Sequence, residues 1–122
     1  MDLEGKVVIV TGAGSGMGNA TARALACRGA QIAALDLDVD AVCRLVGEIG
    51  GLGVECDVSN ESSAVEAVQR VVSELGGPRV LVNCAGIALA QKIVGREGPH
   101  NLELFRKVIN TNLVGAFNMI CL

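Results

Sequence analysis

The fold of this chain is decided by residues 6–18, Lys-Val-Val-Ile-Val-Thr-Gly-Ala-Gly-Ser-Gly-Met-Gly. The stretch begins with an apolar run that does not alternate with polar residues, which is typical of a parallel strand buried on both faces. Glycines then recur at every second position, and a pattern of helical period runs from about Ser15 to Arg28, where Gly29 ends it. This order predicts a buried strand, a glycine-rich turn and a helix.

The glycines between Thr11 and Gly18 follow the pattern T-G-x-x-x-G-x-G. The strict G-x-G-x-x-G spacing is not met, because its third glycine would fall on Met17 or Asn19. A glycine cluster alone could be an ordinary turn. Between a buried strand and a helix, however, it favours a pyrophosphate-binding loop, since glycine lets the backbone approach closely and the helix start offers unpaired N–H groups.

The rest of the chain repeats the alternation of strand and helix. Such alternation predicts right-handed βαβ crossovers, and hence an α/β fold with a doubly wound, Rossmann-like parallel sheet, strand order 3-2-1-4 and helices on both faces. The fourth strand would then be an uncovered apolar edge. We expect strands at 31–37, 52–58 and 79–82, a loop over about 87–100, and helices that begin at Asp38 or Asp40, at Ser59 or Asn60, and at Asn101.

Composition excludes several classes of protein. The 122 residues suit one domain, and with 51% hydrophobic and 19% charged residues the chain is too apolar to be disordered. A net charge of −3 with scattered Lys and Arg gives no electrostatic footprint for nucleic acid. The sequence has no apolar run of the roughly 18–20 residues that span a bilayer, and its start lacks a secretory signal, so we expect no membrane contact and a cytoplasmic location.

The cysteines do not predict a metal site. They number five, and none has the spacing of a Cys/His zinc site. We expect them to be small buried side chains in a reducing compartment, with the exception of Cys84. The remaining four are Cys27, Cys43, Cys56 and Cys121.

Two acidic residues are placed to contact a bound dinucleotide. Asp36 lies 18 residues after Gly18, near the end of the second expected strand, where a carboxylate can accept both ribose hydroxyls and repel a 2′-phosphate. No basic residue follows it closely, which favours NAD over NADP; the alternative is a surface Asp at the start of the next helix. Asp57 could bond an adenine while Val58 packs on the ring, although an Asp there could equally start a turn.

Together with Asn83-x-Ala85-Gly86 and Asn112, these motifs resemble the N-terminal half of the short-chain dehydrogenase/reductase family over essentially the whole chain. The sequence from Val82 to Asn118, with its long loop, resembles the 3-hydroxyacyl-CoA dehydrogenase subgroup, which also acts on hydroxysteroids. The resemblance implies an NAD-dependent oxidoreductase that transfers a hydride between NAD and a secondary alcohol or ketone, with a 3-hydroxyacyl-CoA as the expected substrate. It also implies a homo-oligomer, because the last helix forms a dimer interface in that family.

The resemblance assigns a role to each matching residue. Asn112 would be catalytic: it bends a helix and holds a water of the proton relay, and the Asn-x-x-Gly pattern selects it over Asn110. The pyrophosphate and ribose of the coenzyme would be contacted by Gly12, Ser15, Gly16, Met17 and Gly18. Asp36 would hold the adenosine ribose, and Asp57 and Val58 would contact the adenine. Near the nicotinamide-side ribose would lie Asn83, Cys84, Ala85 and Gly86, where Cys84 replaces a second Asn of the family motif.

The resemblance also implies a catalytic Ser and a Tyr-x-x-x-Lys motif, which the family carries beyond position 122. This chain has no Tyr, and its only His, His100, lies in a polar loop where we expect it to face solvent. We therefore expect the 122 residues to be the first half of a larger dehydrogenase and to be inactive alone. The alternative is a non-catalytic NAD-binding fragment or pseudoenzyme that acts through self-association.

Overall fold

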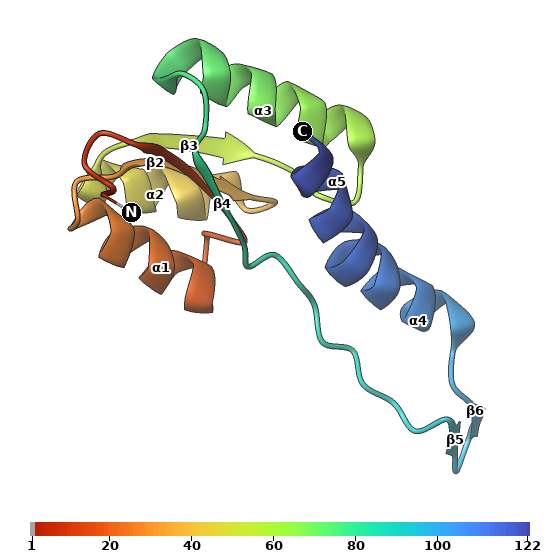
Figure 1. The fold of residues 1–122 in the computed structure, drawn as a ribbon. Helices are drawn as coiled ribbons and strands as arrows, with labels where there is room; N and C mark the ends of the chain where they lie inside the picture. Colours follow the sequence, from red (N-terminus) through yellow and green to blue (C-terminus); the bar gives the residue numbers. More distant parts are fainter. Residues whose placement is uncertain (1) are drawn as a thin grey trace.

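The computed structural model describes residues 2–122, which form a four-stranded parallel sheet with helices on both faces (Figure 1). The strand order is β3-β2-β1-β4, which confirms the predicted order and places the first strand in the interior of the sheet. Within the described residues, β4 pairs with β1 alone and forms one edge. The strands are β1 (Val7–Thr11), β2 (Gln31–Asp36), β3 (Leu52–Glu55) and β4 (Val80–Asn83).

The two faces of the sheet bury two separate apolar clusters. Because side chains alternate along a strand, Val8 and Val10 of β1 point to one face and Val7 and Ile9 to the other. The first face packs against α1 (Gly16–Ala26) and α2 (Val39–Ile49), and the second against α3 (Glu61–Leu75). No helix formed by residues 2–122 is both long and apolar enough to cross a membrane.

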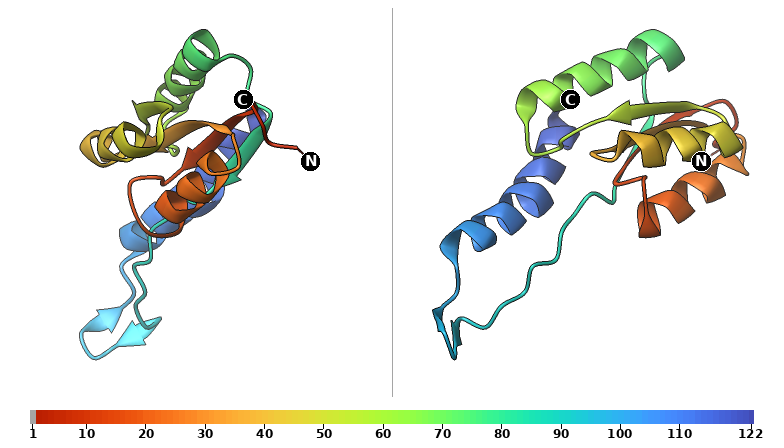
Figure 2. Two further views of the ribbon diagram at one scale, coloured as in Figure 1. Left: turned by 90° about the vertical axis from the view of Figure 1, so that its left-hand side faces the viewer. Right: turned by 180° about the vertical axis from the view of Figure 1, so that it is seen from behind.

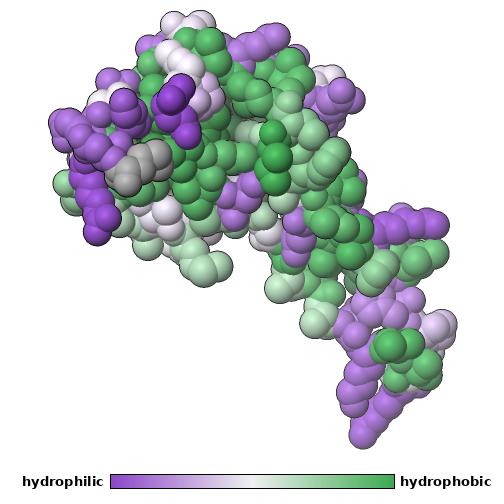
Figure 3. All heavy atoms as spheres, viewed as in Figure 1, coloured by the Kyte–Doolittle hydropathy of each residue, from purple (hydrophilic) through white to green (hydrophobic). Residues whose placement is uncertain are grey.

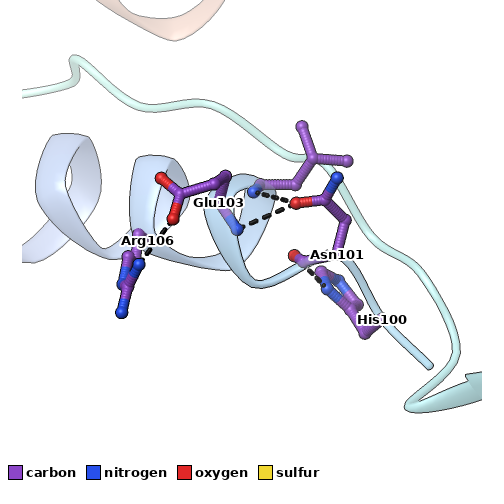
Figure 4. Close-up of polar contacts among 5 residues, drawn as sticks. His100, Asn101, Glu103 and Arg106 are labelled. Atoms are coloured by element: carbon purple, nitrogen blue, oxygen red, sulfur yellow. Dashed lines mark hydrogen bonds and ion pairs between the residues drawn. The ribbon is translucent and has the colours of Figure 1, made fainter.

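Side-chain caps define the starts of three helices. Asp38, Asn60 and Asn101 each accept a hydrogen bond from a backbone N–H of the first turn of α2, α3 and α4 (Leu102–Ile109), respectively. Figure 4 shows this for Asn101. Of the pairs that the sequence left open, Asp38 is therefore the cap rather than Asp40, and Asn60 rather than Ser59.

The segment between β4 and the last helices extends away from the sheet (Figures 1 and 2). It was predicted to be a loop, but it contains a short antiparallel hairpin, β5 (Val94–Gly95) and β6 (Gly98–Pro99). The single last helix predicted from the sequence is also interrupted. It consists of α4 (Leu102–Ile109), the π-helical turn η1 (Asn110–Val114) and α5 (Gly115–Cys121).

The apolar stripe of these last helices faces solvent. Phe117 is 66% exposed, whereas Met119 on the opposite side of α5 is 3% exposed and packs beneath the sheet. Gly115 permits this contact, because a Cβ there would lie 2.6 Å from the Cγ2 of Val58. Figure 3 shows apolar atoms along these helices. We call the following set the exposed apolar face: Phe105, Ile109, Leu113, Phe117 and Ile120.

The prediction that the cysteines are buried was wrong for most of them. Only Cys56 is buried, and Cys84 is half-buried at the end of β4. Cys27, Cys43 and Cys121 are exposed because they lie at the end or on the outer side of a helix whose other side packs on the sheet.

Candidate functional site

A cleft of about 460 Å³ opens at the carboxyl ends of the parallel strands. In doubly wound sheets ligands bind at this edge, where the chain order reverses, here between β1 and β4. The cleft brings together eleven of the thirteen residues that the sequence singled out: Gly12, Ser15, Gly16, Met17, Gly18, Asp36, Asp57, Val58, Cys84, Ala85 and Gly86.

The glycine-rich turn is packed so tightly that side chains are excluded from its base. Gly12 has a φ of +64°, and a Cβ on it would lie 2.7 Å from the backbone N of Ala85. A Cβ on Gly18 would collide with the carbonyl oxygen of Gly12. Gly16 also has a positive φ, of +51°, but the space beside it is open. The base of the turn is therefore filled by backbone, while its rim is free to receive a ligand.

Thr11 joins the ends of β1 and β4. Its side chain is fully buried, and its Oγ1 accepts hydrogen bonds from the backbone N of Cys84 at 3.2 Å and of Ala85 at 3.1 Å. These two N–H groups follow the last residue of a strand and lack a sheet partner. Thr11 thus holds Ala85 against Gly12, a role that motif reading alone did not assign to it.

The start of α1 offers free backbone donors to the cleft. Ser15 occupies the cap position, but unlike the caps of α2, α3 and α4 it makes no side-chain hydrogen bond to the first turn. The first N–H groups of a helix then remain unpaired and carry a partial positive charge. Because the first turn has no acidic side chain either, this end of α1 suits an anion such as a pyrophosphate.

Asp36 lies at the rim of the cleft with a fixed carboxylate. Its Oδ2 accepts a hydrogen bond from the backbone N of Gly14 at 2.9 Å, and its Oδ1 accepts one from the backbone N of Asp38 at 3.0 Å. Each carboxylate oxygen can accept a second hydrogen bond, so the group still has acceptor capacity for two hydroxyls. The cap of α2 is Asp38, which removes the main alternative role that the sequence allowed for Asp36.

Asp57 and Val58 form the wall of the cleft beyond β3. The Oδ1 of Asp57 accepts hydrogen bonds from the backbone N and the Oγ of Ser59, so this residue does start a turn. Its Oδ2 has no hydrogen-bond partner among residues 2–122. Val58 is buried, and its carbonyl accepts a hydrogen bond from the Nδ2 of Asn118 on α5 at 2.9 Å.

The two remaining candidates, Asn83 and Asn112, do not line the cleft. The Oδ1 of Asn112 accepts from the backbone N of Ile87 at 2.8 Å, and its Nδ2 donates to the carbonyl of the same residue at 2.9 Å. Its side-chain amide therefore holds the segment after Gly86 beside η1. The catalytic role implied for Asn112 stays a prediction.

Sequence reasoning missed one wall of the cleft. Lys107, Asn110 and Thr111 line it from α4 and η1. They are spaced at i, i+3 and i+4, so they share one side of the helix. This polar spacing in the sequence could have indicated a helix side that faces the cleft. The other cleft residues without an assigned role were Leu37, Cys56, Ser59 and Ile87.

Burial raises the pKa of the Cys56 thiol from 9.0 to about 11, and the nearby Asp57 carboxylate adds to this shift while a hydrogen bond with Ser63 opposes it. Between these two pH values the unfolded chain loses the thiol proton and the folded chain keeps it. Stability from this group is therefore complete below pH 9 and falls as the pH rises toward 11.

We expect urea unfolding to show this dependence. Between pH 8 and 10.5, the free energy of unfolding should fall more for the wild type than for Cys56→Ala. Exposed Cys43→Ala serves as the control and should follow the wild type. Equal losses in the wild type and Cys56→Ala would contradict this assignment.

The cleft as a whole fits the two phosphates and the ribose of a dinucleotide. The glycine turn and the uncapped start of α1 suit the pyrophosphate, and Asp36 suits a ribose with free hydroxyls. The cleft has no Tyr or His on its walls. The titratable side chains on its walls are those of Asp36, Cys56, Asp57, Cys84 and Lys107.

Comparison with known proteins extends over nearly the whole chain. Residues 6–122 match the family described as short chain dehydrogenase. D-threitol dehydrogenase of Mycolicibacterium smegmatis is 44% identical over 122 residues, covering 96% of this chain and 45% of that protein. The 3-hydroxyacyl-CoA dehydrogenase type-2 of Bos taurus is 38% identical over 123 residues, covering 97% of this chain and 47% of that protein.

A solved structure shows the same arrangement. The 3-ketoacyl-(acyl-carrier-protein) reductase from Brucella melitensis, complexed with NADH, superposes with a TM-score of 0.88 at 36% sequence identity. The match covers 96% of this chain and 48% of that one. The chain thus spans about half the length of the curated relatives it matches.

Proposed function

The chain belongs to the short-chain dehydrogenase family, and from that premise we propose that its cleft binds NAD and supplies the coenzyme-binding half of a dehydrogenase. The reaction is hydride transfer between NAD and a secondary alcohol or ketone. The observation that carries the proposal is the carboxylate of Asp36, fixed at the cleft rim beside a glycine turn that leaves room for a pyrophosphate. When bound, NAD supplies a nicotinamide ring that accepts or gives up a hydride.

The chain's own residues bind and orient this coenzyme. The backbone N–H groups at the start of α1 receive the pyrophosphate, and Asp36 accepts hydrogen bonds from the adenosine ribose. Asp57 and Val58 meet the adenine, and Cys84 to Gly86 lie near the nicotinamide-side ribose. Asn112 contributes by holding Ile87 at the cleft through both polar atoms of its side-chain amide. Its part in a proton relay stays a prediction from the family resemblance.

A preference for NAD over NADP follows from the charge at the cleft rim. The residues after Asp36 are Leu37 and Asp38, and neither can neutralise a 2′-phosphate. A phosphate would instead lie against the Asp36 carboxylate without a cation to pair with. The reductase from Brucella melitensis, whose structure contains NADH, supports the same choice.

The substrate proposed for the whole enzyme is a 3-hydroxyacyl-CoA. Similarity to 3-hydroxyacyl-CoA dehydrogenase type-2 from Bos taurus, and the same name on the relative from Homo sapiens at 37% identity, supports this choice. The 44% identity to D-threitol dehydrogenase favours the coarser description, a dehydrogenase acting on an alcohol.

Calorimetric titration tests coenzyme binding. We expect the 122-residue chain to bind NAD with a dissociation constant at least tenfold lower than that for NADP. Adenosine alone should compete with NAD, because Asp36 lies in one cleft with Asp57 and Val58, the residues proposed to meet the adenine. Equal affinity for NAD and NADP, or no binding of either, would contradict the proposal.

The 122 residues should show no dehydrogenase turnover. The sequence has no Tyr, and its one His, His100, lies outside the cleft with its Nδ1 at 2.7 Å from the carbonyl of Asn101 (Figure 4). An alcohol cannot lose its proton efficiently without such a positioned acid or base. NADH formation from 3-hydroxybutyryl-CoA, followed at 340 nm with pure chain, should stay at the level without protein; measurable formation would show that another group acts as the base.

A second function, self-association without catalysis, is favoured by the exposed apolar face. Five large apolar side chains on α4, η1 and α5 face solvent together, which is unusual for a monomer. Replacing Phe117 with Glu should shift the chain toward monomer in analytical ultracentrifugation, because a carboxylate is costly to bury. Val72→Glu, on an exposed position of α3, is the control and should leave association unchanged. A wild type that is monomeric at high concentration would rule this function out.

A further inference from the structure

The peptide unit between Ala13 and Gly14 is held from both sides. Its carbonyl oxygen accepts a hydrogen bond from the Nδ2 of Asn19 at 3.3 Å. Its N–H, on Gly14, donates to the Oδ2 of Asp36 at 2.9 Å. Because a trans peptide is planar, its C=O and N–H point in opposite directions and turn together. Asn19 on one side therefore fixes the direction of the N–H that holds Asp36 on the other.

The orientation of the Asn19 amide is itself determined. Its Oδ1 accepts a hydrogen bond from the Nε of Arg23 at 2.9 Å, which leaves the Nδ2 toward Ala13. An arginine can only donate, so a flipped amide would lose both hydrogen bonds. Arg23 in turn pairs with Glu48 of α2 at 2.8 Å, and this pairing lowers the pKa of the Glu48 carboxyl.

The turn is also attached to the sheet by a contact that does not involve Asn19. The N–H of Ala13 donates to the carbonyl of Leu35 on β2, which attaches the turn to the sheet independently. Asn19 and Arg23 are only half-buried, and exposed ion pairs such as Arg23–Glu48 contribute little to stability. What Asn19 adds is the direction of a single peptide.

We propose that Asn19 is a positioning residue for the ribose-binding carboxylate, acting through the Ala13–Gly14 peptide to hold Asp36 in the orientation that selects NAD. This inference rests on the proposed NAD function. Without Asn19 the peptide can rotate, Asp36 loses its partner on Gly14, and the carboxylate leaves the position where it accepts ribose hydroxyls and repels a 2′-phosphate.

The link between Asn19 and Asp36 can be tested without coenzyme. Amide hydrogen exchange by NMR should show Gly14 exchanging at least about fivefold faster in Asn19→Leu than in the wild type, because its acceptor is no longer held. Asp36→Ala is the positive control and should give the same acceleration. Thr21→Val on the same helix is the matched control and should leave the Gly14 exchange rate unchanged. The exchange rates of the β1 and β2 amides should be unchanged in every variant.

The functional consequence is read from coenzyme selectivity. Asn19→Leu should lower the ratio of NAD to NADP affinity about tenfold, the scale of one charged hydrogen bond, whereas a merely structural loss would weaken both coenzymes alike. Arg23→Met should also speed the exchange of the Gly14 amide and lower the ratio of NAD to NADP affinity. It replaces Asn19→Leu as the test variant if Asn19→Leu does not fold. An unchanged Gly14 exchange rate in Asn19→Leu would overturn the inference, as would an unchanged ratio of NAD to NADP affinity. A wild type that binds no NAD would instead overturn the proposed function. The exchange measurement would then still decide whether Asn19 holds Asp36 through the Ala13–Gly14 peptide.

Discussion

Replacing Gly12 with alanine is expected to destabilise the chain by about 2–5 kcal/mol. Two costs add. Gly12 has a φ of +64°, which disfavours any L side chain, and the added Cβ would lie 2.7 Å from the backbone N of Ala85. Because Thr11 holds that backbone with two hydrogen bonds, Ala85 cannot move away without losing them. Urea unfolding without coenzyme measures the change.

Gly16→Ala is the matched control for this collision. Gly16 has a similar positive φ, of +51°, but no atom lies within 4 Å of a Cβ placed on it. Its replacement should therefore cost only the conformational term, about 1–2 kcal/mol. Equal destabilisation by the two variants would show that the contact between Gly12 and Ala85 is not tight, and the description of the turn would have to change.

Replacing Asp36 with alanine should weaken NAD binding by about 1–3 kcal/mol, the range for a lost charged hydrogen bond. The affinity for NADP should rise or stay the same, because the carboxylate that opposes the 2′-phosphate is gone. The two effects together remove the preference between the coenzymes. Calorimetric titration of the variant with each coenzyme gives both numbers.

Asp40→Ala controls for the loss of a negative charge. Asp40 is exposed in the first turn of α2 and lies outside the cleft, so its removal should leave the ratio of NAD to NADP affinity unchanged. If Asp36→Ala and Asp40→Ala behave alike, the effect of Asp36 is long-range electrostatics and not contact with a ribose. If neither variant alters binding, Asp36 is not part of the site.

Strand order and the cleft could be predicted from the sequence because both follow from local rules. The apolar run before Thr11, the glycines after it and the repeated alternation specify a parallel sheet with its first strand inside. The carboxyl ends of neighbouring parallel strands then have to meet, so Asp36 and Ala85 share one edge with Gly12 although they are far apart in the chain. The cleft residues that could be predicted from the sequence are those that lie at or shortly after the end of a strand.

Other features depend on packing that no local pattern contains. The side of α5 that meets the sheet is set by Gly115, which lets the helix approach Val58, while Phe117 and Ile120 are left outside. Lys107 reaches the cleft only because α4 and η1 continue from α5 past the strand ends. The hydrogen bond from Gly14 to Asp36 depends on the orientation of one peptide, which the sequence does not reveal.

The central claim is that the cleft at the strand ends binds NAD. Two-dimensional ¹H–¹⁵N NMR of the chain during titration with NAD tests it most directly, because each backbone amide reports separately. We expect saturable shifts at residues 12–18, at Asp36, at Asp57 and Val58, and at residues 84–86, with none at residues 79–81 on the β4 edge. Shifts confined to that edge or to the exposed apolar face, or no shifts at all at millimolar NAD, would contradict it.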